Sequence, residues 1–259
     1  MLNLINTFIN SPLDQFESQT FFSIFTPFMD MNNFNITTFA LYTFIVLFII
    51  ISLFMFTNNN NMIMGSKWFI TQEMIYDTMV NTIKNQMGGK LWGFYMPFIY
   101  TFFMFILVSN LLSMIPYSFA LTAQFVFIIS LSFMVWLGMT IMGFYKHGLV
   151  FFALFVPQGT PLVLVPLLVL IEMMSYIMRS LSLGLRLAAN VMAGHLLMII
   201  LGGLLMQFMS INILTTILGF IPLLIILCVV MLEFAIAMIQ SYVWTVLMAS
   251  YMKDVQYLH

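Results

Sequence analysis

Charged residues are scarce in this sequence, and their scarcity excludes most soluble proteins. Asp, Glu, Lys and Arg together make up 6% of the 259 residues, whereas soluble domains contain about 25%. The formal net charge is −1, so the chain has no basic surface for the phosphates of nucleic acid. Hydrophobic residues make up 63%, and the mean hydropathy is +1.10. The sequence therefore predicts an integral membrane protein.

The residues and motifs of most catalytic centres are also missing. Cys228 is the only cysteine, so neither a disulfide framework nor a cysteine-based metal site is expected within one chain. No G-x-x-x-x-G-K-[ST] loop is present to bind ATP. No His-x-x-x-His or Glu-x-x-His spacing offers a metal or haem site. We therefore expect no cofactor and no enzyme activity of the chain on its own.

The N-terminal segment lacks basic residues. Residues 1–10 contain no Lys or Arg, which is typical of neither a secretory signal nor a basic transit peptide. Residues 1–35 carry Asp14, Glu17 and Asp30 and are expected to stay outside the membrane. The positive-inside rule places this segment on the outer side, because Lys67, Lys84 and other lysines follow the first apolar span.

Apolar runs and their interruptions predict the membrane helices. A helix needs about 20 apolar residues to cross a bilayer core of about 30 Å. Residues 36–56 fit a first span, and 91–145 fit a helical hairpin linked at Pro116-Tyr117-Ser118. Residues 66–87 mix apolar residues at helical spacing with charges, which favours an amphipathic helix on the membrane surface. A short soluble connector helix is the alternative for that segment.

The last third, 162–254, is expected to form a long tilted hairpin. As helices, residues 162–209 and 213–251 would be about 70 Å and about 55–60 Å long at 1.5 Å per residue. Both exceed the bilayer thickness, so they must tilt steeply, bend or lie nearly in the membrane plane. Gly202-Gly203 and Pro222 are the expected bends. The alternative divides the first stretch into two spans. The predicted fold is all-α, with about five membrane helices and one amphipathic surface helix.

Four charges lie within these two apolar stretches: Glu172, Arg179, Arg186 and Glu233. Each costs roughly 2.5–3.5 kcal/mol at a membrane helix centre, and such residues usually mark an ion pathway. Structural ion pairing is the alternative, and it is strongest for Glu172 with Arg179, which are seven residues apart. No acidic residue lies within a turn of Arg186.

Arg186 is expected to face a partner inside the membrane. Ser182, Ala189 and Ala193 lie beside it on the helix, and small residues allow another helix to approach closely. Arginine stays protonated in proteins, so it supplies a fixed positive charge instead of carrying protons. A carboxylate on the partner is its expected ligand.

Groups that exchange or relay protons lie close to this arginine in the sequence. Histidine titrates near neutral pH, and His195 is nine residues beyond Arg186, on the opposite side of an ideal helix. If the hairpin folds near residues 209–214, His195 comes level with Glu233 and Arg186 with Gln240. Asn190 lies one turn after Arg186. Glu233, Gln240 and Asp254 are spaced by multiples of seven, which predicts a polar stripe along the second helix.

Three segments carry the most specific pattern in the chain: 11–16 (SPLDQF), 182–195 (SLGLRLAANVMAGH) and 232–244 (LEFAIAMIQSYVW). Together they resemble the subunit a family of mitochondrial F-type ATP synthases, and the first resembles its fungal branch. The resemblance covers essentially the whole chain. It implies a stator subunit of the membrane Fo sector, which forms two offset proton half-channels at the rotating c-ring.

The resemblance also implies roles for single residues. Arg186 corresponds to the essential arginine that faces the c-ring carboxylates, and Arg179 to a second arginine near the ring. The other implied positions are Asn190, His195, Glu233 and Gln240 in the intermembrane-space half-channel, and Glu172 and Asp254 in the matrix half-channel.

Location and partners follow from the same resemblance. A multi-pass protein of the mitochondrial inner membrane is implied, in contact with the c-ring, subunit b, subunit 8 and lipid. Residues 1–10 are expected to be a cleaved leader, as in the fungal branch. The main alternative is a proton-translocating subunit of a respiratory-chain complex, although such subunits usually have more spans and buried lysines. A structural or assembly protein of the membrane is a third interpretation.

Overall fold

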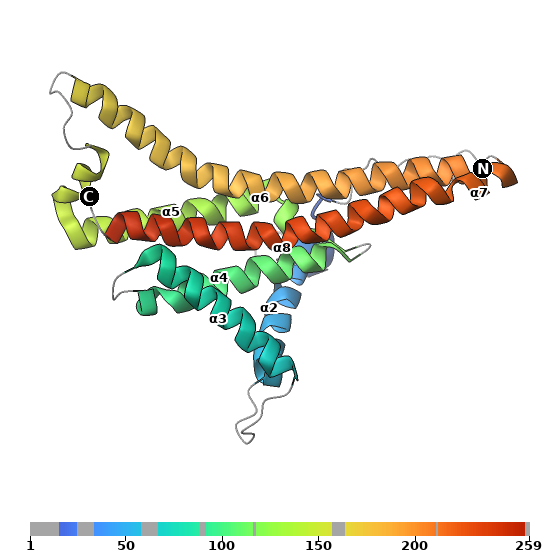
Figure 1. Ribbon diagram of the computed structural model, residues 1–259, viewed down its shortest axis with the longest axis horizontal. Coiled ribbons are helices and arrows are strands. Elements are labelled where there is room, and N and C mark those ends of the chain that lie inside the picture. The colour runs from blue at the N-terminus through green and yellow to red at the C-terminus, as the bar shows by residue number, and fades with distance from the viewer. Residues whose placement is uncertain are drawn as a thin grey trace.

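The computed structural model describes residues 16–24, 34–57, 67–88, 92–115, 118–156, 164–210 and 212–256. The expected leader at 1–10, Asp14 and Asp30 lie outside the described residues. The elements, shown in Figure 1, are β1 (Thr20–Ile24), β2 (Phe34–Thr37), α2 (Thr38–Thr57), α3 (Lys67–Met87), α4 (Trp92–Ser113), η3 (Leu121–Ala123), α5 (Phe125–His147), η4 (Gly148–Phe155), α6 (Val165–Met209), α7 (Ile213–Leu218) and α8 (Phe220–Gln256).

In the part of the chain that the structure describes, five helical segments are long and apolar enough to cross a membrane. They are α2, α4, α5 with the start of η4, α6 and α8. The charged helix α3 is not among them. The predicted class, an all-α integral membrane protein with about five membrane helices and one amphipathic helix, is confirmed.

Helices α6 and α8 form the long hairpin that dominates the molecule. They contain 45 and 37 residues, which corresponds to about 68 Å and about 56 Å of helix. Figure 1 shows the later, orange part of α6 running beside the red α8, while the first, gold part slopes away from the bundle. In the same view α2 runs across the direction of this hairpin. A bilayer that α2 crosses would therefore be crossed obliquely by α6 and α8.

The breaks in the hairpin differ from the predicted bends. Helix α6 is continuous through Gly202 and Gly203, so the alternative that divides this stretch into two helices is wrong. Pro222 lies in the first turn of α8, where the missing N–H of proline costs no helical hydrogen bond. The helix instead breaks at Gly219, between α7 and α8. The side chain of Met209 lies against this glycine and leaves no room for a larger residue.

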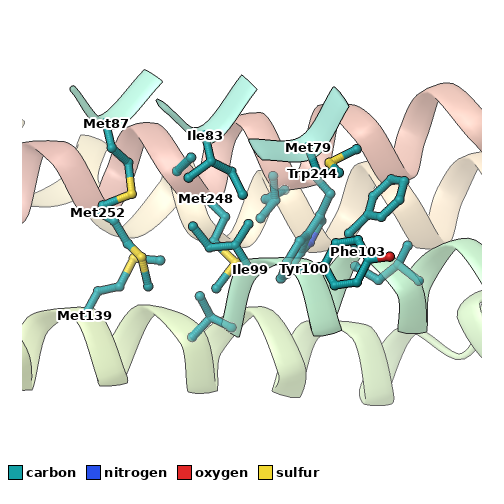
Figure 2. Close-up of a cluster of buried hydrophobic side chains, with 14 of the residues drawn as sticks. Met79, Ile83, Met87, Ile99, Tyr100, Phe103, Met139, Trp244, Met248 and Met252 are labelled. Carbon is teal, nitrogen blue, oxygen red and sulfur yellow. The ribbon is translucent and has the colours of Figure 1, made fainter. Parts of the chain in front are cut away.

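The core lies where α3, α4, α5 and α8 meet. Figure 2 shows methionine, isoleucine and aromatic side chains from these helices in contact. Trp244 of α8 is buried and stacks on Phe102 of α4, with their ring centroids 5.5 Å apart. Met79, Ile83 and Met87 are the buried side of α3, so its apolar stripe packs on α4 and α8 while its charged side remains exposed. This arrangement explains the mixed pattern of residues 66–87.

Two close approaches hold α6 and α8 against the other helices. At Gly184 of α6, a Cβ atom would lie 2.6 Å from Ser132 Oγ and 3.2 Å from the carbonyl oxygen of Ile128, so only glycine fits against α5. On the other side, Asn110 of α4 donates a 3.2 Å hydrogen bond to the carbonyl oxygen of Ala237 in α8. Asn110 is buried, so water does not compete for this bond. The bond therefore fixes α8 against α4 at Ala237, one turn after Glu233.

The segments before α2 and between α4 and α5 differ from the prediction. Strands β1 and β2 form a two-stranded antiparallel sheet, which the sequence analysis did not predict. The link between α4 and α5 is longer than the predicted tight turn, because α4 ends at Ser113 and α5 begins at Phe125. The intervening η3 is buried, and Ala120 and Ala123 pack with Val191 of α6.

Candidate functional site

A cavity of about 620 Å³ opens between the N-terminal segment, α2, α4, α6 and α8. Its titratable lining groups come from four separate parts of the chain: Glu17 before β1, Tyr42 of α2, His195 of α6 and Glu233 of α8. The structure thus places His195 and Glu233 on one cavity. The other lining residues are Gln19, Thr38, Ser113, Met114, Ile115, Ser118, Phe119, Met198, Ile199 and Val230.

Glu233 reaches α6 because a glycine leaves room for its carboxyl group. A Cβ atom at Gly194 would lie 2.7 Å from Glu233 Cδ and 3.0 Å from Cγ, and closer still to Oε1. The carboxyl group therefore lies directly over the backbone of α6, next to His195 in the sequence. The register of the hairpin and the missing side chain at Gly194 together produce this contact.

His195 is enclosed by the cavity wall and by the N-terminal segment. Its Nε2 atom is buried and forms no hydrogen bond with any residue that the structure describes. The ring of Phe16 packs edge-on against it, with the centroids 6.3 Å apart. The imidazole thus lies between the apolar ring of Phe16 and a cavity that Glu233 also lines.

A second polar site lies further along the hairpin. Arg179 Nη1 of α6 is 3.4 Å from Asp254 Oδ2 in the last turns of α8, with side-chain exposures of 43% and 41%. The guanidinium group also lies 5.5 Å from the ring centroid of Tyr251. Glu172 is half-buried and forms no ion pair within the described part of the chain. The alternative that Glu172 pairs with Arg179 is therefore wrong.

Arg186 lies on a face of α6 that the other described residues leave exposed. Its side chain is exposed, as are the neighbouring Ser182, Ala189 and Ala193. Among the described residues it forms no hydrogen bond and no ion pair. Leu187 on the other side of the helix is buried. The arginine therefore presents its charge outward, from a surface of small residues.

The register of the hairpin differs somewhat from the predicted one. The contacts of Gly194 with Glu233 and of Arg179 with Asp254 place Arg186 level with about residues 241–247 of α8 at equal rise per residue. Gln240 is therefore nearer the level of Asn190 than that of Arg186. Both Asn190 and Gln240 are half-buried. The prediction placed Arg186 about one turn too far from the C-terminal end of α8.

The three parts of the site are spaced along one helix. At 1.5 Å per residue, Arg186 is about 10 Å along the helix axis from Arg179 and about 14 Å from His195. The arginine thus stands between the cavity that His195 and Glu233 line and the partly exposed ion pair of Arg179 with Asp254. Asn190 lies between Arg186 and the cavity, so polar groups continue from the cavity towards the arginine.

Three residues of this arrangement were missed in the sequence analysis. Glu17 was one of several acidic residues in the first 35, and no local pattern distinguished it. Tyr251 lies beside Arg179 only because of the hairpin register. Asn110 looked like an ordinary polar residue in a membrane span, although a buried amide in such a helix signals a hydrogen bond to a neighbouring helix.

The site holds groups that can exchange protons. No cluster of three or more His, Cys, Asp or Glu residues suited to a metal ion occurs in the described part of the chain. Carboxylate, imidazole and amide groups instead occupy two places along a membrane hairpin, with a fixed cation between them. Intramembrane ionisable groups of this kind form proton relays. The fold and site define a proton-conducting subunit of a membrane complex.

Comparison with known proteins identifies the family of this membrane subunit. Residues 40–253 match the family described as ATP synthase A chain. The chain is 62% identical to ATP synthase subunit a of Saccharomyces cerevisiae over 259 residues, with 100% of both chains covered. It is 66% identical to that of Vanderwaltozyma polyspora over 252 residues, which cover 97% of this chain and 99% of the relative. The chain belongs to the ATP synthase subunit a family.

Membership of this family establishes the general function. Subunit a is the proton-translocating stator subunit of the Fo sector, works with the c-ring and is not an enzyme on its own. The respiratory-chain and structural-protein interpretations are therefore wrong.

Proposed function

We propose that the cavity beside His195 and Glu233 is the half-channel that brings protons from the intermembrane space to the c-ring. Arg186 faces the ring carboxylates, and the region of Arg179, Asp254 and Glu172 is the half-channel towards the matrix. The spacing along α6 carries this proposal. Two polar regions lie on opposite sides of one outward-facing arginine, offset by about 24 Å along the helix.

The inlet half-channel needs water and groups that exchange protons. A cavity of about 620 Å³ has room for on the order of 20 water molecules at about 30 Å³ each. His195 and Glu233 on its wall accept and release protons, and the amides of Asn190 and Gln240 extend the polar path towards Arg186. Each proton then neutralises a ring carboxylate, which allows that site to rotate into the lipid.

Arg186 separates the two half-channels. Its positive charge is permanent, so it favours the ionised form of an approaching ring carboxylate and drives release of its proton. The same charge repels a proton that would pass directly between the half-channels. A proton that crosses 100 mV carries about 2.3 kcal/mol, and such a leak would lose this energy. The small residues beside Arg186 allow the ring helix to come close.

The proposed matrix half-channel is built from partly exposed groups. The side chains of Arg179 and Asp254 are both accessible from outside the helix bundle, which suits a path for the released proton. Asp254 lies near the end of α8, and Glu172 lies near the start of α6. These two carboxylates are suited to carry protons away from Arg186.

Location and stator contacts complete the proposal. We place the subunit in the mitochondrial inner membrane, with the residues before α2 on the intermembrane-space side. Val46 is the only buried residue of α2, and its exposed apolar residues include Phe44, Phe48 and Phe56. Surfaces of this kind suit lipid and the membrane helices of subunit b and subunit 8.

Replacing Glu233 tests the inlet half-channel. We expect Glu233→Gln to assemble normally and to lose most ATP synthesis, because glutamine cannot carry the proton. Glu73→Gln is the matched control, since Glu73 is exposed on α3 and far in sequence from the hairpin. ATP synthesis by inner-membrane vesicles measures the effect, and native gels measure assembly. Normal synthesis by an assembled Glu233→Gln complex would show that the cavity is not the proton path.

A further inference from the structure

The residues just before β1 form one wall of the inlet cavity. Glu17 and Gln19 line it together with His195 and Glu233. Glu17 is exposed, whereas His195 and Glu233 are half-buried. A residue that is exposed and also lines the cavity lies where the cavity meets the surface. The carboxylate of Glu17 is therefore at the mouth, and the other two groups are deeper.

Contacts on both sides of Glu17 hold it in this place. The side-chain amide of Gln124, at the start of α5, donates a hydrogen bond to the carbonyl oxygen of Phe16. On the other side, the backbone N–H of Thr38 donates a 2.9 Å hydrogen bond to the carbonyl oxygen of Gln19. The segment is thus tied to the start of α5 and to the start of α2.

Phe16 adds an apolar anchor. Its ring packs against the buried cluster of Ala120, Ala123 and Val191 and contacts the His195 ring edge-on. Glu17 is therefore one residue away from a side chain that touches His195. These contacts hold a segment that lies outside the membrane helices and that brings a carboxylate to the cavity.

We propose that Glu17 collects protons at the mouth of the inlet half-channel, and that Phe16 and Gln124 are positioning residues that hold it there. This inference rests on the proposed function of the cavity. Negative charge at the opening of a narrow cleft raises the local concentration of cations and their rate of arrival by about tenfold or more. A carboxylate at the mouth also binds a proton and passes it through cavity water to His195 or Glu233.

Among the described residues, the charged and titratable groups that line this cavity are Glu17, Tyr42 from α2, His195 from α6 and Glu233 from α8, while α4 contributes Ser113. Of the two carboxylates in this set, Glu17 is the one outside the membrane helices. Its effect should be largest when protons are scarce on the intermembrane-space side, because proton arrival then limits the rate.

The test uses purified ATP synthase in liposomes with the catalytic sector outward, so that the lumen corresponds to the intermembrane space. A potassium diffusion potential keeps the total driving force constant while the lumenal pH is varied, and the initial rate of ATP synthesis is measured. We expect Glu17→Gln to match the wild type at acidic lumenal pH and to lose about tenfold at alkaline lumenal pH. Imidazole buffer in the lumen should restore most of the rate, and Glu17→Asp should behave like the wild type.

Controls separate a relay from a structural role. Glu73→Gln makes the same chemical change on α3 and should leave the pH profile unchanged. Gln124→Ala loosens the segment and should give a smaller loss with the same pH dependence and the same recovery in buffer. If Glu17→Gln fails to assemble, Gln124→Ala decides the question, because a wild-type profile of this variant would overturn the inference.

Two results would overturn the inference. One is a Glu17→Gln profile identical to that of the wild type, and the other is a loss that neither lumenal pH nor imidazole alters. Glu233→Gln in the same liposomes distinguishes failure of the inlet half-channel from failure of the role of Glu17. If Glu233→Gln makes no ATP while Glu17→Gln has the wild-type rate, only the role of Glu17 is wrong. If both are active, the cavity is not the inlet half-channel.

Discussion

Replacing Gly194 with alanine should displace the carboxyl group of Glu233 without changing any ionisable residue. The new Cβ atom would lie 2.7 Å from Glu233 Cδ, whereas ordinary contacts at such a site are 3.4–4 Å. The carboxyl carbon must therefore move by at least about 0.7 Å, and its oxygen atom by more. Since Glu233 is flexible, the helices themselves need not separate.

We expect Gly194→Ala to lower the rate of ATP synthesis and to leave the stability of the complex unchanged. In reactions that depend on position, a displacement of about 1 Å can lower the rate about 100-fold. Cavity water relaxes this requirement, so we expect a loss of roughly tenfold in ATP synthesis by Gly194→Ala. Alanine is a better helix former than glycine by about 1 kcal/mol, so the complex should assemble normally.

Gly202→Ala is the matched control for this change. Gly202 lies two turns further along the same helix, and a Cβ atom there would meet no atom within 4 Å. It gains the same helix propensity without touching Glu233. Inner-membrane vesicles from both variants are compared for ATP synthesis per assembled complex. Equal, normal rates would refute the argument that the position of Glu233 over α6 matters for proton transfer.

Three further changes test other parts of the structure. Gly184→Val should prevent α6 from packing on α5, because the valine side chain would overlap Ser132 and the carbonyl of Ile128. Native gels should show loss of the complex. Gly138→Val, at an open position of α5, is the control and should assemble. Asp254→Asn removes a partly exposed ion pair and should cost under about 1 kcal/mol of stability, yet slow ATP synthesis; normal synthesis would remove Asp254 from the proton path. Asn110→Leu loses the hydrogen bond to Ala237, which is worth about 1 kcal/mol. Thermal inactivation of the detergent-solubilised complex should therefore occur at a lower temperature. An unchanged inactivation temperature would show that this bond does not hold α8.

Much of the fold could be predicted because the bilayer permits few solutions. Apolar runs long enough to span, with polar segments between them, are direct consequences of unsatisfied backbone groups in lipid. The length of the last two runs predicted a hairpin longer than the bilayer is thick. The positions of the breaks could not be predicted from glycine alone, because α6 continues through Gly202. The break at Gly219 lies where Met209 of another helix packs against this glycine.

The site was predictable to a different extent. Arg186, His195 and Glu233 were found because charge and imidazole are costly in a membrane. Glu17 was not, because acidic residues are ordinary in water, and only its contacts through Phe16 and Gln124 bring it to the cavity. The pairing of Arg179 with Asp254 instead of Glu172 depends on the register between α6 and α8, which no local pattern of either helix determines.

The most direct test of the account is ATP-driven proton pumping by inside-out inner-membrane vesicles that carry Arg186→Gln, with assembly checked on native gels. If Arg186 separates two half-channels at the c-ring, the complex should assemble and pumping should be lost, because the ring carboxylates no longer meet a fixed positive charge. Normal pumping by an assembled Arg186→Gln complex would show that the arginine is structural and that it does not separate two half-channels.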